Sequence, residues 1–535
     1  MKNILEYLEE SSNKYFTKSV FTDQNRELTY GECIQYSKKI GTQLLELHKT
    51  RQPIAVLMDK TAESLTAFFG VVYSGNFYVV IDSMMPLDRI EKIFETLQPI
   101  ALVSDYEHQE VAQKLHNKIY YFEDLINMNI DEEGLSLIRQ QMIDTDPLYA
   151  LFTSGSTGVP KGAILSHRSV INYATWYKET FDITDQTQFG SQTPFYFSMS
   201  VSDVYSTIMS GATLHIIPKS LFSFPIKLIE YMNIKKVNTI YWVPSALCIV
   251  ANLKVLDYMA LDYVDKVLFA GEVMPTKQLN YWIHKIPNAL YANLFGPTET
   301  TDICTYYIID REFKDDEILP IGKSCNNCDI FLLDENNQEV LDTREGELCV
   351  RGSFLAMGYY NNEMKTKEVF VQNPLNKAYP EIIYKTGDLV RYNESGELIY
   401  ITRKDFQIKH MGYRIELGEI EAAVNSLEKI QSSAVIFDEM KDKIVLIYTG
   451  KIDDIGIMEG ISLRVPDYMK PNVIVKVKVM PYNQNGKIDR KWLKGHYEEL
   501  GGKNMKKLLA LLLTLVMCLS LAACGGSGTD TSGTD

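Results

Sequence analysis

Leu151 to Gly162 read LFTSGSTGVPKG, a stretch rich in hydroxyl side chains and glycines that closes on a lysine. Small residues let a backbone approach a ligand closely, and glycines can turn several amide N–H groups toward one point. The stretch therefore suits a polyphosphate, although its spacing does not fit the Walker A motif. Such composition is more often a flexible surface loop. The apolar runs Pro147–Phe152 and Ala163–Leu165 on either side favour a loop held between two strands. The candidate phosphate-binding residues are Thr153, Ser154, Gly155, Ser156, Thr157, Gly158 and Lys161.

Strand-like and helix-like segments alternate around this loop. Buried-strand patterns at Ile54–Met58, Ile100–Ser104 and Lys266–Phe269 are separated by amphipathic helical patterns. This alternation predicts an α/β fold with a parallel sheet and crossover helices. From Gly322 to Leu398 short strands and turn residues predict a β-rich subdomain, and a more charged region begins near Arg403.

Composition and charge limit the class of protein. The chain has 535 residues, 46% hydrophobic and 23% charged, which is typical of a globular protein with two or three domains. A formal net charge of −15 argues against a nucleic-acid partner. The eight cysteines are scattered, which favours a reducing, cytoplasmic compartment. Cys325 and Cys328 form a single CxxC pair without a second pair nearby, so a metal or redox role for them is a minor alternative.

Three further motifs carry chemistry. Asn293–Glu299 read NLFGPTE and place a hydroxyl beside a carboxylate, the oxygen ligands that Mg²⁺ prefers. Tyr384–Asp388 end in a carboxylate that can accept two O–H donors at once. Asn485–Arg490 read NGKIDR, where a lysine supplies a mobile positive charge. Alone, each of these motifs is more often a turn or a solvated surface residue.

Together these stretches resemble the adenylate-forming superfamily. The likeness is to the amino-acid adenylation domains of nonribosomal peptide synthetases and to D-alanine:carrier-protein ligases, and it covers about residues 1–494. It implies a large N-terminal α/β region with a β-rich subdomain and a small mobile C-terminal α+β domain. The expected domains are an adenylation (AMP-binding) domain at 1–403, a C-terminal domain at 404–494 with the catalytic lysine, and a linker at 495–504.

The resemblance also implies roles for individual residues. Lys487, Glu299 and Thr298 would be catalytic, with Glu299 and Thr298 also holding Mg²⁺, and Asp405 would be the hinge between the domains. The DFQIKHMGYRIELGEIE stretch at 405–421 is similar to the family's crossover loop, in which Gly412 would let the backbone reach the pantetheine tunnel or would simply form a hairpin turn. The implied nucleotide contacts are Asn293, Leu294, Phe295, Gly296, Pro297, Asp388, Tyr400 and Arg403.

The chain departs from the family where the substrate binds. Family members that activate α-amino acids hold the ammonium with an aspartate, and Ser198 stands at that position here. A hydroxyl cannot replace a buried carboxylate paired to an ammonium, so a simple α-amino acid is an unexpected substrate. Two hypotheses follow: a substrate whose amine or other donor lies away from the α-carbon and pairs with Asp302, or a carboxylic acid without an amine. The predicted pocket positions are Ser198, Met199, Ser202, Tyr241, Leu268, Ala270, Leu294, Asp302 and Ile303.

The expected reaction joins ATP and a carboxylic acid into an acyl-adenylate and passes the acyl group to the phosphopantetheine thiol of a carrier protein in trans. Two alternatives stay open: an acyl-CoA ligase that uses free coenzyme A, and a non-catalytic adenylate-binding scaffold. The segment 505–535 resembles a bacterial lipoprotein signal, which belongs at an N-terminus, so a fusion or an artefact is its simplest explanation. If this tail is native, it could tether the protein to the inner membrane face.

Overall fold

The computed structural model describes residues 2–154, 159–315, 317–404, 407–482 and 488–501. The chain divides into two compact units, Met1–Glu416 and the residues from Leu417 onward. Asp405, the expected hinge, and the tail at 505–535 lie outside the described residues. None of the helices in the described part combines the length and the apolar character that a membrane crossing requires.

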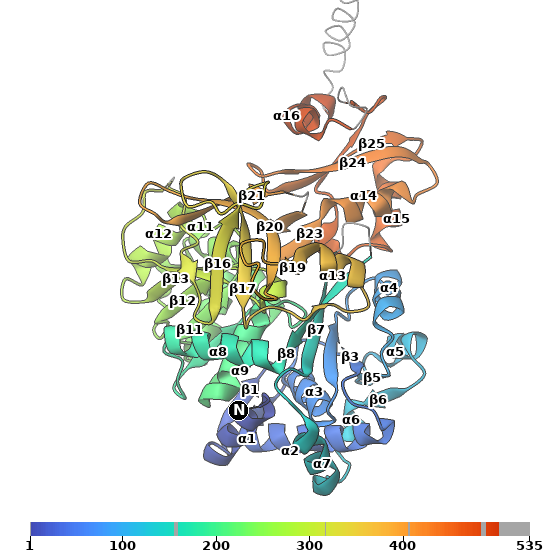
Figure 1. Ribbon diagram of the computed structural model, residues 1–535, viewed down its shortest axis with the longest axis vertical. Helices are drawn as coiled ribbons and strands as arrows, with labels where there is room; N and C mark the ends of the chain where they lie inside the picture. Colours follow the sequence, from blue (N-terminus) through green and yellow to red (C-terminus); the bar gives the residue numbers. More distant parts are fainter. Residues whose placement is uncertain (1, 155–158, 316, 405–406, 483–487, 502–535) are drawn as a thin grey trace, which may run out of the picture. The chain divides into compact units, whose positions relative to one another are not determined.

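The first unit contains a nine-stranded sheet whose central strands are parallel (Figure 1). Antiparallel pairs close it at both edges, β13 with β14 on one side and β1 with β2 on the other. In spatial order its strands are β15 (Lys323–Ser324), β14 (Thr305–Ile308), β13 (Leu290–Phe295), β12 (Lys266–Phe269), β11 (Thr239–Trp242), β9 (Gln188–Ser191), β10 (Thr213–Ile216), β1 (Ser19–Thr22) and β2 (Glu27–Thr29).

A seven-stranded sheet forms the other large layer of this unit. Strands β3, β4, β5, β6 and β7 form its parallel part, and β8 and β18 extend it through antiparallel pairs. In spatial order its strands are β18 (Gly358–Tyr359), β8 (Lys161–Ser166), β7 (Pro147–Thr153), β4 (Phe77–Ile81), β3 (Pro53–Leu57), β5 (Ala101–Ser104) and β6 (Ile119–Tyr121).

Two helices, α3 (Ala62–Tyr73) and α9 (Met199–Ser210), contribute to the core between these sheets. Phe68 on α3 stacks on Tyr78 of β4 with ring centres 4.5 Å apart, while its neighbour Phe69 stacks on Phe21 of β1 at 6.2 Å. Contacts with both sheets explain why α3 is almost entirely buried and carries no broad polar face, since a helix that is apolar all round must be buried.

The remaining helices of the unit follow the strand–helix alternation. Ser166 caps α8, because its side chain accepts a hydrogen bond from the Ser169 amide. These helices are α1 (Leu5–Lys14), α2 (Tyr30–Leu44), α4 (Leu87–Leu97), α5 (Gln109–Leu115), α6 (Phe122–Leu125), α7 (Glu132–Gln141), α8 (His167–Thr180), α10 (Pro225–Ile234), α11 (Pro244–Asn252), α12 (Thr276–Lys285) and α13 (Glu363–Val369), with 3₁₀ turns η1 (Leu45–Leu47), η2 (Lys219–Ser223), η3 (Val255–Asp257) and η4 (Thr298–Thr300).

The predicted β-rich subdomain is a five-stranded antiparallel sheet. It consists of β16 (Cys328–Leu333), β17 (Gly346–Gly352), β20 (Ile382–Tyr392), β19 (Phe370–Gln372) and β21 (Leu398–Arg403). A short hairpin of β22 (Gln407–His410) and β23 (Tyr413–Glu416) ends the first unit. Its turn residues Met411 and Gly412 have φ of +52° and +80°, the left-handed values that a two-residue hairpin turn requires.

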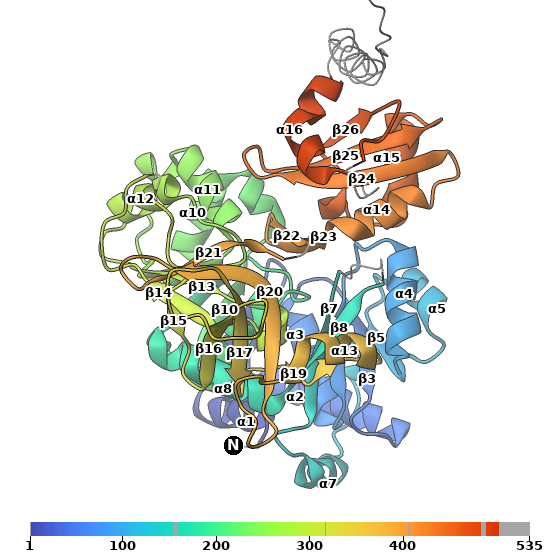
Figure 2. The ribbon, with the colours of Figure 1, turned by 45° about the horizontal axis from the view of Figure 1, so that its top comes forward.

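The second unit is a small α+β domain (Figure 2). Its sheet has the order β24 (Ile430–Asp438), β25 (Lys443–Gly450) and β26 (Val473–Lys476). Its helices are α14 (Leu417–Asn425), α15 (Asp454–Ser462), η5 (Asp467–Met469) and α16 (Arg490–Gly501). Leu493 of α16 packs into a core with Ala434, Val445 and Val475 of the sheet.

The α/β fold class, the β-rich subdomain and the small C-terminal α+β unit are as the sequence predicts, whereas the division of the strands into two large sheets is not predicted from the sequence. Along the chain the boundary between the two compact units falls between Glu416 and Leu417, while the hinge expected at residues 404 and 405 stays a prediction.

Candidate active site

The phosphate-loop candidate lies between two paired strands, as expected from its apolar flanks. Thr153 at the end of β7 is the register partner of Lys161 at the start of β8, so residues 154–160 form the connection. Gly155, Ser156, Thr157 and Gly158 lie outside the described residues. Ser154 is 3% exposed, donates a hydrogen bond to the Arg414 carbonyl at 2.7 Å and accepts one from the Glu416 amide at 3.2 Å. In this structure its hydroxyl therefore binds the backbone of the β22–β23 hairpin.

Glu299 is the centre of a buried charge cluster at the end of β13. Its side chain is fully buried, with Oε2 2.6 Å from Nη1 of Arg414. Its Oε1 accepts a hydrogen bond from the Tyr359 hydroxyl at 2.5 Å and lies 3.9 Å from Nζ of Lys161. Burial pushes the pKa of Glu299 up, but the charges of Arg414 and Lys161 outweigh it and lower that pKa to about 2. Glu299 is therefore an ionised carboxylate inside the protein.

Lys161 faces this carboxylate from the start of β8 and is 8% exposed. Burial, followed by the repulsion of Arg414, lowers the pKa of Lys161 to about 8, and the attraction of Glu299 opposes both effects. The sequence did not assign roles to Arg414 or Tyr359. Arg414 lies within the quoted 405–421 stretch, but nothing in the local pattern indicates that it reaches a residue 115 positions earlier.

The backbone that carries Glu299 is packed too tightly for any residue but glycine at position 296. A Cβ atom on Gly296 would lie 2.5 Å from the Asp302 carbonyl oxygen and 2.5 Å from Cα of Ile303. Asn293 anchors the preceding strand by donating to the Pro320 carbonyl at 2.8 Å. The GPTE motif is therefore a turn that folds back on the residues that follow it. The motif can therefore be a turn and at the same time carry the candidate site residue Glu299.

A second group of predicted residues gathers around Asp388. This residue of β20 is the register partner of Arg403 on β21, and their side chains form an ion pair at 3.0 Å with both groups buried. The aromatic rings of Phe295 and Tyr400 lie 5.6 Å apart, and Nζ of Lys409 lies 4.4 Å from the centre of the Phe295 ring. Burial lowers the pKa of Lys409, and Asp388 is the first charge that opposes this shift. Aromatic faces beside a buried carboxylate are suited to a nucleoside.

Two of the predicted substrate positions, Ser202 and Tyr241, contact a third, Asp302. Tyr241 on β11 faces Leu268 on β12 in register, and α9 contributes Met199 and Ser202. The Asp302 side chain accepts hydrogen bonds from Tyr241 at 2.9 Å and Ser202 at 3.1 Å. Ser198 is half-buried and accepts a 3.5 Å hydrogen bond from Thr298. The other positions are buried, namely Met199, Ser202, Tyr241, Leu268, Ala270, Leu294, Asp302 and Ile303.

Tyr173 of α8 is the pocket residue that the sequence did not predict. Its hydroxyl donates to Asp302 at 3.0 Å and lies 2.6 Å from the Ser202 hydroxyl. It lies on a helix whose pattern indicates only packing, so the sequence contains no signal for this contact.

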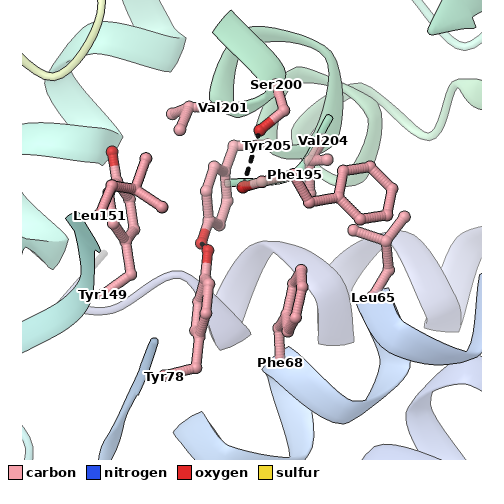
Figure 3. A pocket seen from close by; sticks show the side chains of 10 residues that line it. All are labelled: Leu65, Phe68, Tyr78, Tyr149, Leu151, Phe195, Ser200, Val201, Val204 and Tyr205. Carbon is pink, nitrogen blue, oxygen red and sulfur yellow. Dashed lines mark hydrogen bonds between the residues drawn. The ribbon is translucent and has the colours of Figure 1, made fainter. Parts of the chain in front are cut away.

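A narrow cavity lies beside α9 (Figure 3). Phe68, Tyr78, Tyr149 and Val204 are among its lining residues. The hydroxyls of Tyr78 and Tyr205, two of the lining residues, point at each other and form a hydrogen bond of 2.6 Å (Figure 3). No predicted site residue lines this cavity.

The described cysteines show no sign of a metal or redox centre. Cys325 and Cys328 are buried and reduced, and their sulfurs contact the carbonyls of Ile303 and Cys304 at 4.0 and 3.8 Å. Within the described residues no group of three or more His, Cys, Asp or Glu side chains is arranged to hold a metal ion.

Lys487 lies outside the described residues, as does all of 483–487. The residues on either side of this segment, Tyr482 and Ile488, form an antiparallel bridge. Arg490, which lies three residues after Lys487 in the sequence, forms an ion pair of 2.7 Å with Glu421 within the second unit. The catalytic role expected for Lys487 therefore stays a prediction.

Comparison with known proteins identifies the family. A protein-family model described as AMP-binding enzyme matches residues 8–360, well over half of the chain. The chain is an AMP-binding enzyme. The relative zwittermicin A synthase ZmaJ of Bacillus cereus is 31% identical over 481 residues, which cover 87% of this chain and 90% of the relative. The D-alanine–D-alanyl carrier protein ligase of Staphylococcus aureus is 28% identical over 476 residues, covering 87% and 93%.

Longer synthases also match this AMP-binding enzyme. Tyrocidine synthase 1 of Brevibacillus parabrevis and a mycosubtilin synthase of Bacillus subtilis are each 30% identical to it. The match covers 92% and 94% of this chain, but it spans only 45% and 19% of the length of those two relatives. The resemblance to adenylation domains and to the carrier-protein ligase is thereby confirmed, and the chain is an adenylate-forming ligase.

Solved structures share the fold of this AMP-binding enzyme. The adenylation domain AlmE of Vibrio cholerae, solved with glycyl-adenosine-5′-phosphate, has a TM-score of 0.80 at 20% identity and covers 93% of this chain and 98% of its own. The o-succinylbenzoate CoA synthetase MenE of Bacillus subtilis has a TM-score of 0.79 at 18% identity, with coverage of 92% and 98%. At these identities the likeness concerns the fold alone.

Proposed function

We propose that this AMP-binding enzyme activates a carboxylic acid with ATP and transfers the acyl group to the phosphopantetheine thiol of a carrier protein in trans. In the first step a carboxylate oxygen of the acid attacks the α-phosphorus of ATP, and pyrophosphate leaves. In the second step the carrier thiol, having lost its proton, attacks the acyl carbon, and AMP leaves. The observation that carries the proposal is the buried, ionised Glu299 beside Lys161, at the end of the strand that also carries Phe295.

Different charged groups would bind the phosphates and the nucleoside of ATP. Lys161 and the loop before it would bind the phosphates of ATP, since a buried cation is most effective where water is excluded. Asp388 would accept the two ribose hydroxyls, with Arg403 holding its carboxylate in place, and the Phe295 and Tyr400 rings would contact the adenine. Lys487 would neutralise the charge that develops between the acid and the α-phosphate.

The residues present fit Mg²⁺. An ionised carboxylate, Glu299, stands next to the Thr298 hydroxyl, and Mg²⁺ in phosphate sites is held by one or two carboxylates together with the phosphates. Bound there, the ion would neutralise phosphate charge during the displacement. Glu299 is engaged by Arg414 in this structure, so Arg414 and the ion would compete for one carboxylate oxygen. Its Oε1 already accepts from Tyr359, which would hold the carboxylate in one orientation.

The two candidate functions differ in the thiol that accepts the acyl group. The relative named as a D-alanyl carrier protein ligase supports a carrier, while the shared fold of a CoA synthetase keeps free coenzyme A as the alternative. The purified enzyme would be incubated with ATP, Mg²⁺, a panel of acids and either a phosphopantetheinylated carrier protein or coenzyme A. Intact-mass detection of an acylated carrier with no acyl-CoA supports the proposal, and acyl-CoA with no acylated carrier contradicts it.

The same reaction also tests Lys487, with Lys478 as the matched control. Lys487→Ala is expected to abolish acid-dependent exchange of pyrophosphate into ATP, whereas Lys478→Ala, a change elsewhere in the same unit, is expected to leave it unchanged. Equal exchange in the Lys487→Ala variant and the wild type would remove Lys487 from the mechanism.

A further inference from the structure

We propose that Lys60 is a positioning residue for the acid: its ammonium holds the chain between Ser191 and Asp203, where part of the predicted substrate pocket lies. This role rests on the proposed adenylation function, because the position of the pocket matters only if an acid binds in it. The sequence pattern around Lys60 indicates no role for this residue.

The segment 191–203 leads from the end of β9 into the first turns of α9. It carries three predicted substrate positions, because Ser198 directly precedes α9, and Met199 and Ser202 lie in its first turns. Residues 192–198 belong to neither β9 nor α9, so their position depends on contacts from other parts of the fold. A shift of this connection would displace the pocket positions.

Lys60 reaches this segment from the other large sheet. It lies three residues after β3, which ends at Leu57 in the seven-stranded sheet. Its Nζ donates to the carbonyl of Ser191, the last residue of β9, at 2.9 Å. The same Nζ lies 5.5 Å from the centre of the Phe195 ring, within the range of a cation–π interaction. Lys60 thereby contacts the end of β9 and the connection that follows it.

The third group that faces Lys60 is the carboxylate of Asp203 on α9, which is 1% exposed. Neither of its oxygens forms a hydrogen bond with another described residue. Burial raises the pKa of Asp203 well above its ordinary value, and the charge of Lys60, followed by the nearby Ser191 hydroxyl, opposes this rise. Burial also lowers the pKa of Lys60 to about 7, and Asp203 opposes that shift. The charged form of each group is therefore stabilised by the other group.

The three contacts lie at the beginning, in the middle and at the end of the segment, at Ser191, Phe195 and Asp203. A neutral side chain at position 60 would lose the hydrogen bond, the cation–π contact and the charge attraction together. The proposed phosphate and metal residues, Lys161 and Glu299, are held by a different set of contacts. Loss of the Lys60 charge should therefore weaken binding of the acid more than binding of ATP.

The test is ATP–pyrophosphate exchange by Lys60→Met with the acid that gives the highest activity. This variant keeps the apolar part of the side chain and loses the ammonium. We expect KM for the acid to rise at least about 10-fold while KM for ATP stays within about 2-fold, since a displacement of about 1 Å at a binding group is enough for such a loss. A parallel rise of both KM values, or no change in either, overturns the inference and leaves the adenylation function intact. Exchange with no acid, even by the wild type, overturns both.

Lys39→Met is the matched control. Lys39 lies on α2 and is also half-buried; its Nζ donates to the Ile126 carbonyl at 2.7 Å and lies 5.8 Å from the centre of the Tyr36 ring. These are the same kinds of contact, made away from the segment 191–203. Both KM values of this variant should stay within about 2-fold of the wild type. A rise in KM for the acid as large as that of Lys60→Met overturns the inference, because the effect would not be specific to Lys60.

Two further variants separate positioning from stability. Lys60→Arg keeps a positive charge and should recover most of the affinity for the acid, whereas a KM as high as that of Lys60→Met overturns the inference. Lys60→Met/Asp203→Asn leaves no buried carboxylate without its partner, so its Tm should exceed that of Lys60→Met. Its KM for the acid should nevertheless stay raised, because the contacts with Ser191 and Phe195 are still missing. A wild-type KM in this double variant overturns the inference, since Lys60 would then serve only to neutralise Asp203. If Lys60→Met does not fold, the double variant and Lys60→Arg decide the outcome.

Discussion

The buried pair of Glu299 and Arg414 predicts a large loss of stability when the arginine is removed. Arg414→Met keeps the length and apolar character of the side chain but leaves a fully buried carboxylate without its 2.6 Å partner. Breaking a buried pair in this way costs about 3–5 kcal/mol. Lys161 remains 3.9 Å from the other oxygen, so we expect the lower end, about 3 kcal/mol. For a unit of this size that corresponds to a fall in Tm of about 3 °C.

The loss should depend on pH in a defined direction. Because the folded-state pKa of Glu299 is lowered from its ordinary value of 4.5 to about 2, its contribution is fully present above pH 4.5 and is lost as the pH falls toward 2. Without Arg414 this pKa rises, so the difference in stability between wild type and variant is largest at neutral pH and shrinks between pH 4.5 and 2. Thermal unfolding followed by circular dichroism over this pH range measures both effects.

Arg351→Met is the matched control. Arg351 also pairs with two acids, Asp329 at 2.8 Å and Glu381 at 2.7 Å, but its side chain is 41% exposed. Exposed pairs contribute about 0–1 kcal/mol, so the Tm of this variant should fall by no more than about 1 °C. If Arg414→Met is no less stable than Arg351→Met, the reasoning about the buried cluster is refuted.

Three further changes test other parts of the structure. Asp388→Asn should weaken AMP binding at least about 10-fold in titration calorimetry, because a charged acceptor for the ribose hydroxyls is lost. An unchanged Kd for AMP would exclude Asp388 from the nucleotide site. Gly296→Ala should destabilise the protein by about 1–3 kcal/mol, since its Cβ would lie 2.5 Å from backbone atoms. Gly495→Ala, which meets open space on α16, should instead stabilise by about 0.5–1 kcal/mol, and equal Tm shifts for both would contradict the packing argument. Tyr78→Phe should lower the free energy of unfolding by about 1–3 kcal/mol, because it leaves the buried Tyr205 hydroxyl without its partner. Adding Tyr205→Phe should recover most of this loss. Additive losses in the double variant would show that the hydroxyl pair is not the cause.

The sequence predicts the features that depend on short, local residue patterns. The alternation of apolar strands and amphipathic helices indicates the α/β class, and the flanks of the loop at 151–162 indicate the strand pair that the structure contains. The NLFGPTE motif indicates both a turn and a carboxylate at 299, because the glycine at 296 permits unusual backbone conformations and the proline at 297 restricts φ.

Contacts between residues far apart in the chain leave no such pattern. Arg414 and Glu299 are 115 positions apart, and Tyr173 and Asp302 are 129 apart, so only the folded chain brings each pair together. The γ-turn at Thr301 is also absent from the sequence pattern, because a threonine has no preference for positive φ. Asp302 is recognisable from the sequence as an acid among apolar neighbours, and Ser202 and Tyr241 as pocket positions, but the partner Tyr173 is not.

The central claim is that this enzyme joins an acid to AMP through the acid's own oxygen. The most direct measurement uses the acid with the highest exchange activity, labelled with ¹⁸O in its carboxylate, and mass spectrometry of the AMP released after transfer to a thiol. If the acid oxygen attacks the α-phosphorus, AMP carries one ¹⁸O atom from the acid. Unlabelled AMP, or label in inorganic phosphate formed together with ADP, would contradict the account.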